Sequence, residues 1–114
     1  MSPLLTALHS FVATYHGASK LVDQQRDWHS RIALVASDSG ESINLHVQDG
    51  KVSSIGAPLD EVDLVITAAD GVLVDILTLK QDPNEPYLFG DLTVKGNEAH
   101  FMRLDYVVTM LCPH

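Results

Sequence analysis

The sequence is poor in cysteine, in basic residues and in long apolar runs, and each shortage excludes a class of protein. Its single cysteine, Cys112, excludes a disulfide within the chain and favours a reducing compartment, so we expect a cytoplasmic protein. Seven Lys and Arg residues against fifteen Asp and Glu give a formal net charge of -8, which disfavours nucleic acid and anionic membranes as partners. No apolar run approaches the roughly 18 residues of a membrane-spanning helix, so we expect no integral membrane segment.

Recognisable catalytic and metal-binding motifs are also missing. The sequence has no nucleophile elbow, no phosphate-binding glycine loop, no HExxH helix and no cysteine pair at zinc-ligand spacing. His9 and His16 would share one helical face but lie two turns apart, about 10 Å by helical rise, which is too far for one metal ion without further ligands. We therefore expect no catalytic residue, no metal site and no cofactor, and a protein that is not an enzyme.

What the sequence does contain is the composition of one folded domain over residues 1–114. Hydrophobic residues make up 46% of the chain and charged residues 19%, and these proportions are typical of a globular protein. A chain of 114 residues is long enough to bury one apolar core and too short for two independent ones.

Periodicity in the first half predicts a helix followed by strands. Ser2 and Pro3 fit the cap and the first position of a helix with apolar residues on one face, and Gly17 fits its end. Residues 18–27 fit a short second helix and a loop equally well. Alternating apolar residues and the turn sequences between them then predict strands over residues 28–37, 42–48, 51–55 and 62–68.

The second half predicts a helix, a strand and a helix. We expect Asp70 to cap a helix that stops before Asp82-Pro83, and Asn97 to cap a last helix that reaches Leu111. Residues 84–86 are expected to form a loop, and residues 88–95 a fifth strand. Strands grouped in one run with helices at both ends predict an α+β fold, in which helices cover one face of an antiparallel sheet.

The two late helices carry more apolar residues than one stripe requires. These residues are Leu73, Val74, Ile76, Leu77 and Leu79 on the first helix, and Phe101, Met102, Leu104, Val107, Val108, Met110 and Leu111 on the second. A small sheet can bury only part of this surface. The excess fits a well-filled core, the lining of an internal cavity, or a face that contacts a partner.

Several runs of the chain resemble the sterol carrier protein family. Phe89-Gly90-Asp91-Leu92-Thr93-Val94-Lys95-Gly96-Asn97 is similar to the family signature Q-G-K-L-K-I-x-G-N, and Met102-Arg103-Leu104 is similar to the M-K-L after it. Residues 62–70 resemble the family's strand and helix cap, and Asp49-Gly50-Lys51 resembles its hairpin. The resemblance implies a five-stranded antiparallel sheet covered on one face by helices, with an apolar tunnel that holds fatty acyl chains, sterols or similar lipids.

On this reading the protein binds and carries hydrophobic lipids, such as fatty acyl chains, sterol-like molecules or isoprenoids. Residues on the inward faces of the late elements are then expected to bind the lipid and line the tunnel. They are Leu73, Ile76, Leu77, Leu88, Leu92, Phe101, Leu104 and Val108.

Two other classes of function stay open. A non-catalytic accessory or scaffold module of a lipid, quinone or polyketide pathway would contact a partner enzyme, or a second copy in a homodimer, with Phe89 and Tyr106 as anchors. An enzyme would need Asp105 or His100 inside the tunnel.

Access to the tunnel can also be predicted in two ways. The last helix, which carries adaptable methionines, is expected to move as a lid with Gly96 as its hinge. In the alternative the helix is static and the ligand enters at residues 81–86.

Overall fold

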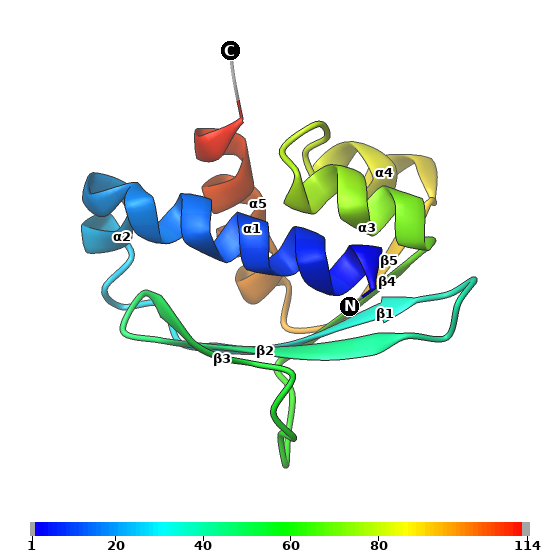
Figure 1. The fold of residues 1–114 in the computed structure, drawn as a ribbon, viewed down its shortest axis with the longest axis horizontal. Helices are drawn as coiled ribbons and strands as arrows, with labels where there is room; N and C mark the ends of the chain where they lie inside the picture. Colours follow the sequence, from blue (N-terminus) through cyan, green and yellow to red (C-terminus); the bar gives the residue numbers. More distant parts are fainter. Residues whose placement is uncertain (1, 113–114) are drawn as a thin grey trace.

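Helices form one layer over one face of a sheet in the computed structural model, which describes residues 2–112 (Figure 1). The helices are α1 (Pro3–Gly17), α2 (Ser19–Gln24), α3 (Asp70–Leu77), α4 (Asn84–Phe89) and α5 (Glu98–Leu111). The strands are β1 (Ser30–Ala36), β2 (Ser42–Gln48), β3 (Lys51–Ile55), β4 (Leu64–Ala68) and β5 (Leu92–Gly96). This arrangement confirms the α+β fold with a five-stranded sheet covered on one face.

Side-chain caps begin the first and last helices at the predicted residues. The Ser2 hydroxyl accepts a hydrogen bond from the backbone N–H of Leu5 at 3.1 Å, and Pro3 fills the first helical position. The Asn97 side chain accepts from the N–H of Ala99 at 2.9 Å at the start of α5. Asp70 differs from its prediction, because it is the first residue of α3 and Ala69 holds the cap position.

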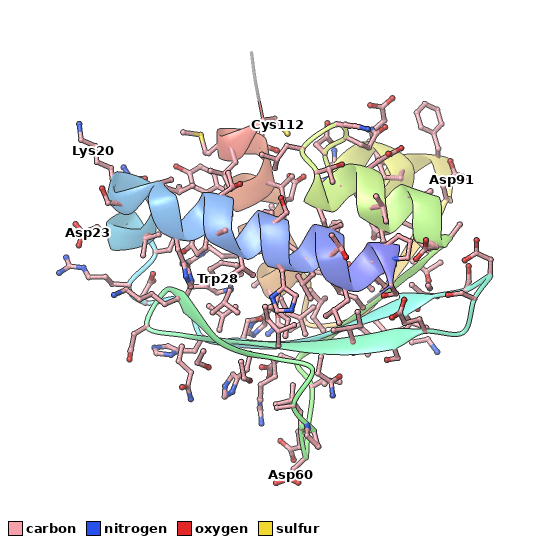
Figure 2. All side chains as sticks on the ribbon, in the orientation of Figure 1. Lys20, Asp23, Trp28, Asp60, Asp91 and Cys112 are labelled. Carbon is pink, nitrogen blue, oxygen red and sulfur yellow. The ribbon has the colours of Figure 1, made fainter. Side chains whose placement is uncertain are left out.

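The strand order β3-β2-β1-β4-β5 corrects the prediction of a wholly antiparallel sheet. β1 pairs with β4 in parallel, from Ile32 beside Leu64 to Ala36 beside Ala68, and the other neighbours are antiparallel. A parallel pair needs a crossover, and residues 56–63 complete it by carrying the chain from the end of β3 across the sheet to the start of β4. This connection hangs from the sheet face opposite the helices, with Asp60 at its outer end (Figure 2). The sheet is therefore mixed.

The expected fifth strand begins later than predicted, because residues 84–89 form helix α4. The Asp82 carboxylate accepts from the N–H of Glu85 at 2.9 Å and fixes the first turn, so the expected loop over residues 84–86 is also wrong. Gly90 ends the helix in the left-handed conformation, with φ +82°. The alternating apolar residues of the predicted strand over 88–95 thus belong partly to helix α4 and partly to strand β5.

The apolar core lies between the helical layer and the sheet. Strand residues that face the helices pair across the sheet, as Leu34 does with Ile43 and Ile66. From the helices, Leu8 and Phe11 of α1 and Val108 of α5 belong to the same contiguous cluster. Among the described residues, no helix is both long enough and apolar enough to cross a membrane.

Candidate functional site

Seven of the eight predicted lipid-binding residues are buried in the apolar core between the helical layer and the sheet. Each of them is at most 6% exposed and belongs to the contiguous core cluster. We call these residues the seam cluster: Leu73, Ile76 and Leu77 of α3, Leu92 of β5, and Phe101, Leu104 and Val108 of α5. α3 is separated in sequence from β5 and α5, which follow each other directly, and side chains of all three elements belong to one contiguous core. Because these side chains are nearly fully buried, a ligand could enter the seam only by displacing them.

Leu88, the eighth predicted residue, lies outside the seam. It is 73% exposed, since it belongs to α4 and not to the predicted strand. Its neighbour Tyr87 packs against Phe101 with ring centroids 5.2 Å apart, so α4 touches the seam cluster through that aromatic pair.

Large apolar side chains are also exposed on α4 and α5. Phe89 is 75% exposed and Tyr106 is 45% exposed, and Met102 and Met110 are exposed on α5 as well. Phe89 and Tyr106 are the two anchors that an accessory module would use. Their exposure is compatible with that alternative, and a partner stays a prediction.

Polar contacts hold the first half of α5 against residues 25–30, which lead from the end of α2 into β1. The Ser30 hydroxyl is hydrogen-bonded to Nδ1 of His100 at 2.7 Å. The Arg103 guanidinium donates to Gln25 Oε1 at 3.0 Å and to both carboxylate oxygens of Asp27, at 2.9 and 3.3 Å. These hydrogen bonds and the charge of Arg103 hold the pKa of the Asp27 carboxyl below its usual value.

The two residues that an enzyme would need lie in separate surroundings on α5. His100 faces Ser30 at the start of β1. Burial, together with the nearby charge of Asp82, raises the pKa of Asp105, and its Oδ1 is buried without a hydrogen-bond partner among the described residues. Within residues 2–112 no group of three or more His, Cys, Asp and Glu side chains is placed to hold a metal ion.

The start of β4 is fixed by a charged pair that the sequence did not indicate. Asp63 accepts hydrogen bonds from the Arg31 backbone N–H at 2.9 Å and from its guanidinium at 3.1 and 3.2 Å. These bonds lower the pKa of the Asp63 carboxyl. The residues are 32 positions apart, so only the parallel pairing of β1 with β4 brings them together.

A surface hollow of about 140 Å³ was likewise missing from the sequence prediction. It lies between the first turns of α5 and the chain before β1, and its lining is Asp27, Trp28, His29, Ala99, His100 and Arg103. Half of the lining comes from residues 27–29 and half from residues 99–103, about 70 positions later, so local patterns could not join them. The lone tryptophan before a strand is the one signal that could have drawn attention to this place.

Comparisons with solved structures show the same fold in several proteins. UbiJ-SCP2, a ubiquinone synthesis protein, matches with a TM-score of 0.69 and 16% identity, over 93% of this chain and 90% of that one. A crystal structure of sterol carrier protein 2 gives a TM-score of 0.68 and 17% identity, over 93% of each chain. Palmitated SCP2L2 from Aedes aegypti gives 0.59 and 15% identity, over 90% of this chain and 98% of that one. At these identities the likeness shows the fold alone.

Comparison with curated proteins finds no match. The model of the SCP-2 sterol transfer family matches residues 15–109, which include all five strands, helices α2, α3 and α4, and α5 up to residue 109. The matched span also contains the whole seam cluster and the Gly90 to Asn97 segment that carries the sequence resemblance. This chain therefore belongs to the SCP-2 sterol transfer family.

Proposed function

We propose that this protein binds a hydrophobic lipid between its helical layer and its sheet and carries it without transforming it. Fatty acyl chains, sterol-like molecules and isoprenoids are the ligand classes. The seam cluster is the observation that carries the proposal, since these apolar side chains, from three elements of a member of this family, are buried in one contiguous core between the helices and the sheet. The palmitated protein from Aedes aegypti, which shares the fold, supports an acyl chain as ligand.

Apolar burial alone can provide the affinity. Each buried methylene contributes roughly 0.8 kcal/mol, so a chain of about sixteen carbons offsets the ordering of ligand and side chains and still supports micromolar binding. No catalytic group is required for this function.

Substitution of the seam cluster tests the proposal. Leu77→Trp and Leu104→Trp add bulk where the lipid would lie, so each should weaken displacement of a fluorescent fatty acid by roughly tenfold or more. Met110→Trp, on the exposed side of the same helix as Leu104, is the matched control and should bind like the parent protein. Native mass spectrometry of the purified protein should show a retained lipid. Unchanged affinity in both folded variants, or no binding at ~100 µM ligand, would contradict the proposal.

An accessory module is the second candidate function, and the exposed Phe89 and Tyr106 favour it. It predicts self-association, or binding to a partner enzyme, that depends on these side chains. Sedimentation of the parent protein and of the Phe89→Ser variant should separate the candidates. A protein that binds no lipid but forms a dimer weakened by Phe89→Ser would favour the module.

A further inference from the structure

Trp28, which lines the hollow between α5 and the chain before β1, carries one polar group that lacks a partner among the described residues. Ser30 and Gln25 are the buried polar residues of this region, and both are hydrogen-bonded, to His100 and to Arg103. The indole Nε1 of Trp28 is also buried, yet it donates to no atom of the described residues. Buried indole N–H groups normally find an acceptor, because leaving one without a partner is costly. The neighbouring groups are satisfied, so this one points to an acceptor supplied from outside the chain.

Trp28 joins the hollow to the apolar core. It lines the hollow, but it is only 4% exposed and belongs to the core cluster. Its ring packs edge-on against the buried Tyr15, with centroids 6.0 Å apart. Figure 2 shows Trp28 between the helical layer and the sheet. A molecule that reached Trp28 from the hollow would therefore have its far end directed toward apolar side chains.

The charged side chains of the hollow suit an oxyanion. Arg103 is a permanent cation, and its contacts with Gln25 and Asp27 leave guanidinium N–H groups unused. His29 and His100 add two imidazoles to the same lining. Asp27 is the one carboxylate in the lining, and Arg103 already binds it.

We infer that this hollow holds the carboxylate head of a bound fatty acid, with the Trp28 N–H as a donor and Arg103 and His100 beside it. The inference rests on the proposed lipid-binding function and deepens it, because it names an acidic lipid as the ligand class. The tail then runs past Trp28 into the core, and the head stays at the surface.

Trp28→Phe tests the donor, because phenylalanine keeps an aromatic ring in the core and lacks the N–H. The variant should stay folded, with some loss of stability because the ring is smaller, and should bind palmitate roughly tenfold more weakly, the effect of one lost hydrogen bond. Tyr106→Phe, which removes an exposed hydroxyl on the outer side of α5, is the matched control and should bind normally. A folded Trp28→Phe variant with the parent's affinity for palmitate would overturn the inference.

The single tryptophan also provides a direct probe, since the protein has one indole N–H signal in a proton–nitrogen NMR spectrum. Palmitate should shift this signal downfield and slow its exchange with water, whereas methyl palmitate should do so less. An unchanged signal with palmitate bound, or an equal response to acid and ester, would overturn the carboxylate assignment. If native mass spectrometry finds that neither palmitate nor methyl palmitate binds, the proposed lipid-binding function fails as well. If both lipids bind and the indole signal responds equally to them, only the carboxylate assignment fails.

Discussion

Gly96 holds a backbone conformation that other residues rarely adopt. Its φ is +115°, and a Cβ at this position would lie 2.3 Å from the carbonyl oxygen of Asp63. The next residue, Asn97, donates its N–H to that same oxygen at 3.0 Å. Gly96 is thus needed for close packing against the start of β4, and its role as a hinge stays a prediction.

We expect Gly96→Ala to destabilise the fold by about 1–3 kcal/mol, because the substitution adds both backbone strain and a backbone clash. Gly71→Ala is the matched control: Gly71 lies in α3 with open space around its Cβ position, so alanine should be neutral or stabilise by up to about 1 kcal/mol. Urea unfolding measures both changes. Equal effects of the two substitutions would contradict this account.

Tyr15 couples α1 to the turn between β2 and β3. Its buried hydroxyl donates to the carbonyl oxygen of Gly50, and burial raises its pKa to about 12. In the unfolded chain this hydroxyl ionises near pH 10, so its contribution to stability is complete below that pH and is lost as pH rises through about 12. Tyr15→Phe should cost about 1 kcal/mol at pH 7 and flatten the alkaline fall in stability.

Thermal unfolding between pH 8 and 12 measures the Tyr15 effect. The exposed Tyr106 provides the control, and Tyr106→Phe should keep the parent's alkaline profile. If the stability of Tyr15→Phe falls as steeply at alkaline pH as that of the parent protein, other groups cause the fall.

At the scale of the elements, substitutions at Leu88 and Leu92 test where helix α4 ends and strand β5 begins. Leu88 is exposed at the end of α4, whereas Leu92 is buried at the start of β5. Leu88→Ala should change stability by no more than about 0.5 kcal/mol, and Leu92→Ala should cost about 2–5 kcal/mol. Chemical denaturation of the two variants gives the comparison. A large loss in Leu88→Ala would restore the predicted strand over residues 88–95.

The contacts of α5 limit how it could act as a lid. Its first half is held in place because His100 is hydrogen-bonded to Ser30, and Arg103 to Gln25 and Asp27. Opening should therefore begin in the second half, near Leu104 and Val108. We expect lipid to slow amide exchange over residues 104–111 more than in β2, as measured by mass spectrometry. Equal protection in both segments, with and without lipid, would leave ligand access to residues 81–86.

At the scale of the whole molecule, the net charge of -8 should govern which membranes receive a lipid. Anionic vesicles repel the protein at low ionic strength, so transfer of a fluorescent fatty acid should be slower to them than to zwitterionic vesicles. The difference should shrink as salt rises, since the Debye length falls from about 10 Å at 0.1 M to about 3 Å at 1 M. Stopped-flow fluorescence measures both rates. Faster transfer to anionic vesicles would show that a local basic surface outweighs the net charge.

Local chemistry determined much of this protein from the sequence alone. The caps at Ser2 and Asn97, the hairpins and the burial of seven seam residues follow from side chains near one another in sequence, which act whatever the rest of the chain does. The segment from Gly90 to Asn97 indicated the family, because a signature of consecutive residues is also a local pattern.

Tertiary structure decided the features that depend on contacts between residues far apart in the sequence. The parallel pairing of β1 with β4 fixed the strand order, and no local pattern encodes which strand a crossover will join. Leu88 alternates with Leu92 as a strand would, yet helix α4 places it in solvent, because the turn after Asp82 and the packing of Tyr87 on Phe101 outweigh the alternation. The Trp28 hollow likewise exists only because folding sets residues 99–103 against residues 27–29.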